Sequence, residues 1–211
     1  MYSIYGLHFS PNTAKVIYVA ETLNIDYDYH EINLQKKEQK TAAHLARHPL
    51  GKVPTLTHDD NHVFESAAIC RYLAVTERSS LYPSNPLTRA HIDQWIDLFS
   101  HHPGRWLEKL LFERVIKAKF EIGSADEVIV SEAMGFLETQ MMAVDDHLNG
   151  KSYFLGVDLS LADFFALAYV ETTRLSGFSL SPYPNLDQWY QHIQTHDAVT
   201  RARETTLRKA P

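Results

Sequence analysis

Two neighbouring segments decide the fold of this chain: Gly51-Lys52-Val53-Pro54-Thr55-Leu56 and Val63-Phe64-Glu65-Ser66-Ala67-Ala68-Ile69. Both contain short apolar runs typical of strands. A proline is tolerated between such runs only at the start of a strand, at an edge or at a bend, so Pro54 marks a special bend. We predict that the bond before Pro54 is cis, so that the bend turns the N–H and C=O of Val53 outward. These two groups can then hold an extended peptide by strand addition.

The pair Glu65-Ser66 stands where the second segment stops reading as a strand and begins to read as a helix. Ser66 is a good N-cap candidate. The first-turn N–H groups of such a helix attract a carboxylate, while the Glu65 side chain is placed to hold an ammonium group. Together the two residues predict a site that recognises both charged groups of one amino acid.

Strands and helices alternate in the first 77 residues. A strand, a helix and a strand at 2–7, 13–23 and 27–34 predict a parallel, right-handed β-α-β unit. Two short strands then flank the turn Asp59-Asp60-Asn61, and the helix that starts at Ser66 closes the domain. This βαβ-ββα order predicts an α/β thioredoxin-like N-terminal domain at 1–77.

A linker rich in Ser, Pro and Asn is expected at 78–87. No convincing strand follows it, so we expect an all-helical C-terminal domain at 88–211. Its helices are expected at 90–116, where Pro103-Gly104 should bend or interrupt the helix, at 127–148 and at 164–170.

Ser160 and Asp163 precede the last, very apolar of these helices. Their spacing fits the S-x-x-D variant of a capping box, in which each side chain satisfies a backbone N–H of the other residue. A helix that is apolar on nearly every side needs a defined start. We therefore interpret both residues as structural.

Both halves of the chain resemble the cytosolic glutathione transferases. In that family the residue before a cis-proline binds the cysteinyl backbone of glutathione, and a Glu/Gln-Ser pair binds its γ-glutamyl end. The resemblance implies that Val53, Glu65 and Ser66 bind glutathione as a co-substrate and that Pro54 is structural. The capping box at Ser160 is also similar to the capping-box and staple motif of the family's helical domain.

The reactions of this family require the thiolate of glutathione, whereas a free thiol has a pKa of about 8.5. A charge-assisted hydrogen bond contributes about 1.5 to 3 kcal/mol, and a helix N-terminus adds about 0.3 to 1 kcal/mol. One hydroxyl at the first βα turn is therefore sufficient to lower the pKa by about two units. The spacing of Ser10 from Gly6 and to Val16 is similar to that of the serine-type phi and theta classes, which implies that Ser10 is the catalytic residue.

Asn12 is the alternative thiolate stabiliser. The run Ser10-Pro11-Asn12 is also similar to the Thr-Pro-Asn of bacterial nu-like members, in which the asparagine contacts glutathione and disulfide-reductase activity is typical. By position, Gln39 and Lys40 stand where phi-like enzymes have a His-Lys pair for the glycyl carboxylate. Lys52 stands where those enzymes often have Gln, and its cation suits a carboxylate.

The second substrate is expected between the domains. The residues expected to line its site are Phe9, Pro11, His101, His102 and Trp106. No metal is expected, because His101-His102 lacks the i, i+4 pairing of a helical zinc site and no cysteine pair supports one.

Composition limits the other function classes. The net charge of −6 argues against a nucleic-acid partner, and no run approaches the length of a membrane span. The N-terminus lacks the layout of a signal peptide, so a cytoplasmic protein is expected. The single cysteine, Cys70, excludes an internal disulfide or a CxxC pair and is interpreted as a core residue.

The sequence therefore predicts a homodimeric glutathione transferase that conjugates the glutathione thiolate to hydrophobic electrophiles. Two alternatives stay open at this point. One is a glutathione-dependent peroxidase or disulfide reductase of the nu-like kind, favoured by Asn12. The other is a non-catalytic protein that uses the same fold to bind a partner.

Overall fold

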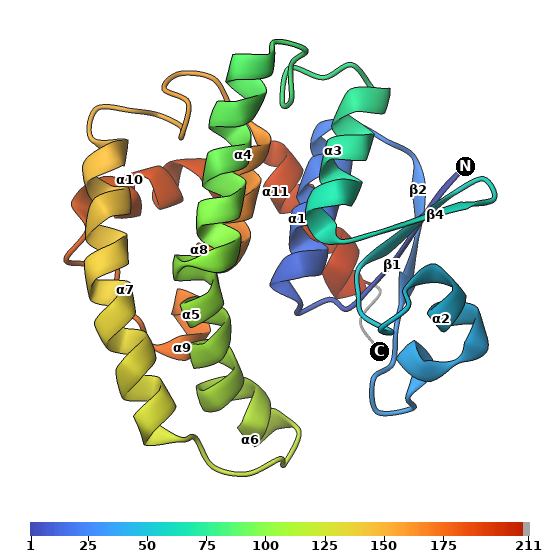
Figure 1. The fold of residues 1–211 in the computed structure, drawn as a ribbon, viewed down its shortest axis with the longest axis horizontal. Coiled ribbons are helices and arrows are strands. Elements are labelled where there is room, and N and C mark those ends of the chain that lie inside the picture. The colour runs from blue at the N-terminus through green and yellow to red at the C-terminus, as the bar shows by residue number, and fades with distance from the viewer. Residues whose placement is uncertain (209–211) are drawn as a thin grey trace. The chain divides into compact units, whose positions relative to one another are not determined.

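The computed structural model describes the backbone of residues 1–208 and the side chains of residues 1–205. Its contacts divide the chain into two compact units (Figure 1): Met1–Pro83 together with the described residues from Thr195 onward, and Ser84–Gln194. The boundary at Pro83 falls inside the predicted linker 78–87. The predicted helical domain was 88–211, but the chain returns to the first unit at Thr195. Residues 209–211 of that predicted domain lie outside the described part.

The first unit is built on a four-stranded sheet with the order β2-β1-β3-β4. The strands are β1 (Tyr2–Gly6), β2 (Tyr27–Glu31), β3 (Thr55–His58) and β4 (Asn61–Phe64). β1 and β2 are parallel, whereas β3 is antiparallel to both of its neighbours. The predicted βαβ-ββα thioredoxin-like domain is confirmed. β2 ends before the predicted position 34, because Asn33 N–H turns to donate to the Glu38 carboxylate.

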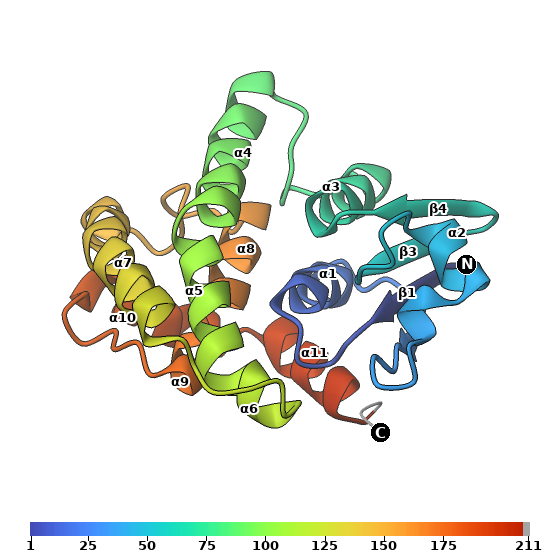
Figure 2. The ribbon, with the colours of Figure 1, turned by 60° about the horizontal axis from the view of Figure 1, so that its bottom comes forward.

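Two helices of this unit, α1 (Pro11–Thr22) and α3 (Ser66–Thr76), lie side by side against the sheet (Figure 2). α1 begins earlier than the predicted 13–23, because a proline fits the first turn of a helix, where its missing N–H has no intrahelical partner. Between β2 and β3 the chain forms a 3₁₀ turn at Glu38–Lys40 and the short helix α2 (Ala42–Arg47). The core between helices and sheet is fully buried and includes Val16, Ile17, Leu56, Ile69 and Leu73.

The last helix, α11 (Asp197–Arg208), packs on α1 of the same unit. The apolar residues Ala198, Val199 and Ala202 are buried. Arg201 donates from Nη2 to the backbone oxygen of Glu21 at 2.7 Å and from Nε to its carboxylate at 3.2 Å. These contacts are the physical reason why the end of the chain belongs with the first unit.

The second unit is all-helical, as predicted. Its elements are α4 (Pro86–His101), α5 (Pro103–Leu111), a π-helical turn (Phe112–Ile116), α6 (Lys117–Lys119), α7 (Glu127–Leu148), α8 (Leu161–Val170), α9 (Thr173–Ser176) and α10 (Pro184–Ile193). Every residue of α8 is buried, and α4, α5 and α10 contact it. The predicted capping box of Ser160 and Asp163 is present at the start of this central helix.

The predicted interruption at Pro103-Gly104 is confirmed. His102 separates α4 from α5, and Pro103 is the first residue of α5. A Cβ atom at Gly104 would lie 2.2 Å from the backbone oxygen of Phe99 and 2.7 Å from the ring of Tyr169. Only glycine lets α5 approach its neighbours this closely.

Candidate functional site

Three segments with predicted site residues leave the same end of the sheet. Tyr5 of β1 pairs with Thr55 of β3, and Thr55 pairs with Phe64 of β4. The residues that follow β1, precede β3 and follow β4 must therefore lie at this one end. These residues are Leu7–Ser10, Val53-Pro54 and Glu65-Ser66.

Ser10 is held at the start of α1 by a closed turn. Its N–H donates to the backbone oxygen of Leu7 at 2.9 Å, and the Leu7 N–H donates to Thr13 Oγ1 at 3.1 Å. Ser10 is the N-cap of α1, where its Oγ accepts the Thr13 N–H at 3.4 Å. Because the cap uses a lone pair of Oγ, the hydroxyl hydrogen is left to donate to a ligand. Phe9 and Pro11 flank Ser10, and all three residues are half-buried.

Asn12 lies in the first turn of α1. Its Oδ1 accepts a hydrogen bond from Lys15 Nζ at 2.6 Å, and Lys15 is 1% exposed. The carboxamide of Asn12 is therefore oriented by a buried cation, and its NH₂ group is the end that can donate.

The Val53-Pro54 bond is cis, as predicted. Within the part of the chain that the structure describes, neither the N–H nor the C=O of Val53 has a hydrogen-bond partner. The preceding segment is fixed from two sides: His44 Nε2 lies 2.9 Å from the Lys52 oxygen, and Lys40 Nζ donates to the Leu50 oxygen at 3.2 Å. Val53 thus presents a donor and acceptor pair on a fixed segment.

Gly51 explains how Gln39 is brought to this segment. Its φ of 61° lies in the left-handed region, and a Cβ atom there would lie 2.3 Å from the backbone oxygen of Gln39. The 3₁₀ turn with Gln39 and Lys40 therefore packs directly against the residues before Val53. The Oε1 atom of Gln39 is buried and has no hydrogen-bond partner among the described residues, while Lys40 and Lys52 are exposed.

The start of α3 differs from the prediction in one respect. Glu65 and not Ser66 is the N-cap, and Ser66 is the first helical residue. Glu65 has a φ of 69°, which is strained for a residue other than glycine. This backbone places its carboxylate outward, 70% exposed, beside the first-turn N–H groups. The predicted combination of a carboxylate and a helix N-terminus is present, although no Ser66 side-chain cap forms.

Sequence reasoning missed two polar contacts at this end of the sheet. His48 is 3% exposed, accepts the Leu50 N–H at Nδ1 at 3.1 Å and places Nε2 3.8 Å from Glu65 Oε1. Glu31, at the end of β2, accepts hydrogen bonds from His8 and from the Tyr29 hydroxyl. The position of Glu31 could have been predicted from the sequence, because a parallel β-α-β unit brings the ends of β1 and β2 together.

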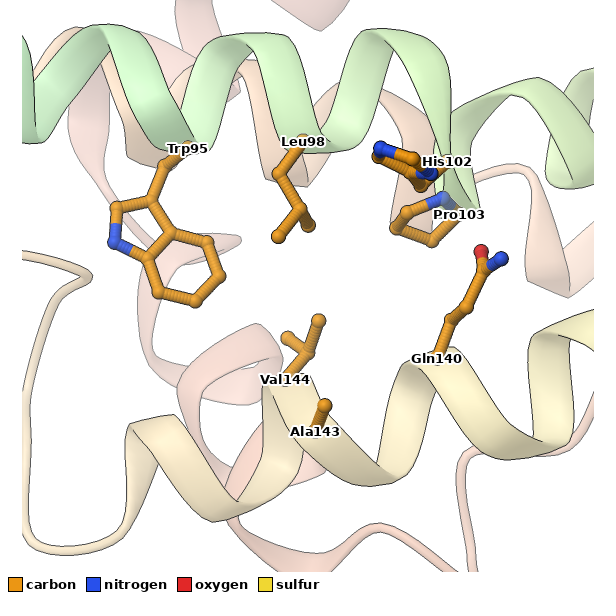
Figure 3. Close-up of a pocket in the computed structure, with 7 residues that line it drawn as sticks. All are labelled: Trp95, Leu98, His102, Pro103, Gln140, Ala143 and Val144. Atoms are coloured by element: carbon orange, nitrogen blue, oxygen red, sulfur yellow. The ribbon is translucent and has the colours of Figure 1, made fainter.

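Two of the three predicted second-substrate residues of the helical unit, His102 and Trp106, face α7. His102 lines an open, apolar pocket of about 140 Å³ between α4, α5 and α7 (Figure 3). Trp106 is 9% exposed and stacks on Phe136 of α7 with ring centroids 4.5 Å apart. His101 is exposed at the end of α4. The pocket is lined by Trp95, Leu98, His102, Pro103, Gln140, Ala143 and Val144.

Cys70 is fully buried in α3, as predicted for a core residue. Burial raises the pKa of its thiol to about 12, so it stays protonated and is no nucleophile. Within residues 1–208, no helix has the length and apolar composition needed to cross a membrane. No group of three or more His, Cys, Asp or Glu side chains in this range is arranged to hold a metal ion.

Two family models match the chain. The model "Glutathione S-transferase, N-terminal domain" matches residues 2–75, and the model "Glutathione S-transferase, C-terminal domain" matches residues 117–204. Glutathione S-transferase 1 of Zea mays is 28% identical over 201 residues, which are 94% of each chain. Elongation factor 1-gamma 1 of Oryza sativa subsp. japonica is 31% identical over 189 residues, which are 88% of this chain and 42% of that protein.

A solved structure is similar over the whole length. Glutathione S-transferase I from maize, in complex with an atrazine glutathione conjugate, superposes with a TM-score of 0.89 at 27% identity and covers 99% of both chains. The similarity therefore extends over both units.

Proposed function

Since this chain belongs to the glutathione S-transferase family, we propose that it conjugates the thiolate of glutathione to hydrophobic electrophiles, with Ser10 as the residue that stabilises the thiolate. It is an enzyme of the serine-type kind, similar to plant relatives such as Glutathione S-transferase 1 of Zea mays. Glutathione is its co-substrate.

One observation carries the role of Ser10. Its Oγ accepts the Thr13 N–H as the N-cap of α1, and this leaves the hydroxyl hydrogen to point at a ligand. A sulfur that accepts this hydroxyl hydrogen also faces the positive end of the α1 dipole. The two effects together contribute about 2 to 4 kcal/mol in favour of the thiolate, which is sufficient to ionise bound glutathione at neutral pH.

The other predicted residues are assigned to the rest of the tripeptide. The N–H and C=O of Val53 pair with the cysteinyl backbone of glutathione, and Pro54 keeps them turned outward. Glu65 holds the γ-glutamyl ammonium, while Ser66 and the first turn of α3 hold its carboxylate. The glycyl carboxylate is assigned to Lys40, Lys52 and the amide of Gln39. The turn that carries Gln39 and Lys40 packs against the residues before Val53.

A disulfide-reductase or peroxidase activity is the second candidate. It is favoured by the carboxamide of Asn12, which Lys15 orients through Oδ1 so that the NH₂ group can donate to a sulfur. The third candidate, a non-catalytic binding role, is supported by the similarity to Elongation factor 1-gamma 1. Against it stand the polar groups assigned above to the tripeptide, for which a scaffold has no use.

We also propose that the protein forms a homodimer and acts in the cytoplasm. The dimer is supported by exposed apolar surface on α7, where Val128, Phe136 and Met142 are 79%, 46% and 60% exposed. The apolar pocket that reaches His102 opens beside this helix. Exposed apolar surface of this kind is typical of protein interfaces. The molar mass in solution, measured by light scattering, tests the proposed homodimer.

Three measurements on the wild-type protein test the function. Retention on immobilised glutathione tests binding. A thiolate absorbance titration of the complex with glutathione is expected to give a pKa well below the free value of about 8.5. Parallel assays with a chlorodinitrobenzene and with a small glutathione mixed disulfide decide between conjugation and reduction. No retention and no shift in the thiol pKa would refute the proposed activity.

A further inference from the structure

A histidine–carboxylate pair, His8 and Glu31, lies at the same end of the sheet as Ser10 and takes no part in the binding roles assigned above. The Glu31 carboxylate accepts the His8 backbone N–H at 3.2 and 3.1 Å and lies 2.7 Å from Nδ1 of the His8 ring. It also accepts the Tyr29 hydroxyl at 2.6 Å. The side chain of Glu31 is only 13% exposed. A nearly buried carboxylate with this many donors holds the His8 ring in one orientation.

This contact fixes the tautomer of His8. An ionised carboxylate can only accept hydrogen bonds, so the ring hydrogen is on Nδ1. Nε2 of the neutral ring therefore carries a lone pair. Nε2 has no partner among the described residues, and the side chain is 23% exposed. The ring is thus a base held by a carboxylate, with its basic nitrogen open to a ligand or a water molecule.

His8 occupies the same turn as Ser10. The Ser10 N–H donates to the Leu7 oxygen at 2.9 Å, which makes His8 the second residue of the four-residue turn and Ser10 the last. Two peptide units separate their Cα atoms, which are therefore at most about 7.6 Å apart. This Cα spacing is short enough for an imidazole at position 8 to meet a sulfur bound at the Ser10 hydroxyl, directly or through one water molecule.

The proposed chemistry requires such a base. A thiol that becomes a thiolate must give up its proton, and Ser10 cannot take it because its hydroxyl donates to the sulfur. The other histidines that touch the glutathione-binding segments are already engaged: His44 Nε2 faces the Lys52 oxygen, and His48 Nδ1 accepts the Leu50 N–H. Both rings are also almost completely buried.

We propose that His8, oriented by Glu31, accepts the proton of the glutathione thiol; this inference rests on the proposed transferase function. The S–H bond breaks and its electron pair stays on sulfur, while an N–H bond forms at Nε2. The resulting imidazolium keeps its Nδ1–H bonded to the Glu31 carboxylate, which stabilises the positive charge. The proton then passes to bulk water before the next turnover.

The test uses the full-length protein with His8→Ala, His8→Gln and Glu31→Gln. We expect His8→Ala to lower kcat/KM for conjugation at neutral pH by about 100-fold, which is typical of a lost general base, and added imidazole to restore a large part of the rate. Glu31→Gln should give a smaller loss, because the ring keeps a partner but loses the carboxylate charge. His62→Gln, on β4 at the opposite end of the sheet, is the matched control and should behave like wild type.

Two results would overturn this role of His8. One is an unchanged pH profile of kcat/KM in folded His8→Ala and His8→Gln. The other is a loss of rate that imidazole does not restore and that Glu31→Gln reproduces as a higher KM for glutathione. The pair would then only hold the turn. Failure of the proposed transferase function would be seen in a different measurement. In that case the thiol pKa of glutathione bound to the wild-type protein would not be lowered.

Discussion

Nε2 of His48 lies 3.8 Å from Oε1 of Glu65, while Nδ1 of the same ring accepts the Leu50 N–H at 3.1 Å. Because Nδ1 accepts, the hydrogen of the neutral ring is on Nε2 and points toward the Glu65 carboxylate. One buried imidazole therefore joins the segment before Val53-Pro54 to the N-cap residue of α3. Both segments are assigned to glutathione binding.

His48→Phe should weaken glutathione binding without slowing the chemical step. Phenylalanine keeps a ring beside Phe64, whose centroid lies 4.9 Å away, but it removes both polar contacts of His48. Their loss is expected to raise KM for glutathione about 10-fold, from about 1 to 2 kcal/mol for the hydrogen bond and the electrostatic contact together, and to leave kcat near the wild-type value. Steady-state kinetics with varied glutathione measure both. A fall in kcat at unchanged KM would contradict this assignment.

Acid should remove the hydrogen bond that Nδ1 of His48 accepts from the Leu50 N–H, because a protonated ring has no acceptor nitrogen. Burial lowers the pKa of His48, an effect that outweighs the opposing attraction of Glu65 and is reinforced by His44 and Lys52. With its folded pKa below the unfolded value of about 6.5, the neutral ring contributes stability that is present above that pH and is lost as pH falls through the folded pKa. The unfolding temperature of wild type should therefore fall more steeply than that of His48→Asn on acidification from neutral pH. Parallel slopes in the two proteins would count against a buried neutral imidazole.

Asp163→Ala should destabilise the protein more than the loss of an ordinary helix cap. The carboxylate accepts hydrogen bonds from the Phe154 N–H, the Ser160 N–H and hydroxyl, and the Trp189 indole, at distances from 2.9 to 3.2 Å. Alanine would leave these buried donors without an acceptor, at about 1 to 3 kcal/mol each. We expect the free energy of unfolding, measured in urea, to fall by at least about 3 kcal/mol.

The control for Asp163 is Asp126→Ala. Asp126 is the exposed N-cap of α7 and accepts only the N–H groups of Val128 and Ile129. Its loss is expected to cost about 0.5 to 2 kcal/mol. Equal losses in the two variants would show that burial of the Asp163 network adds nothing.

Local patterns in the sequence were sufficient for the order of strands and helices along the first unit, the cis bond before Pro54, the break at Pro103 and the capping box at Ser160, because each depends on residues close together in the chain. The partners that are distant in sequence were not predicted. Trp189 reaches Asp163 across 26 positions, and Arg201 reaches Glu21 across 180. The N-cap of α3 was misassigned to Ser66 because propensity favours serine, whereas the structure holds Glu65 in a strained conformation there.

Gly135 shares the face of α7 that carries Val128 and Met142, the surface proposed for the dimer, so Gly135→Ala should stabilise the dissociated single chain. Gly135 lies inside α7, where glycine costs about 0.5 to 1 kcal/mol relative to alanine, and an added Cβ atom would meet nothing within 4 Å. The unfolding midpoint should rise accordingly. Gly104→Ala is the matched variant and should be destabilising, because its Cβ would overlap Phe99 and Tyr169. A midpoint for Gly135→Ala at or below that of wild type, at a dilution where light scattering gives the mass of one chain, would contradict this prediction.

The last prediction separates the two tasks of Ser10, which caps α1 and is proposed to donate to the thiolate. Ser10→Gly removes the hydroxyl but leaves a residue that is tolerated as an N-cap, so the stability should change by only a few tenths of a kcal/mol. The thiol pKa of bound glutathione should rise by about one to two units, from the loss of a charged hydrogen bond, and conjugation at neutral pH should fall about 10-fold. Ser10→Thr keeps a hydroxyl that can both cap α1 and donate to the thiolate, so this variant should resemble wild type. The measurement is the thiolate absorbance titration, with Asn12→Ala in parallel. If Ser10→Gly titrates like wild type while Asn12→Ala shifts upward, Asn12 is the thiolate stabiliser and the disulfide-reductase activity becomes the better supported function.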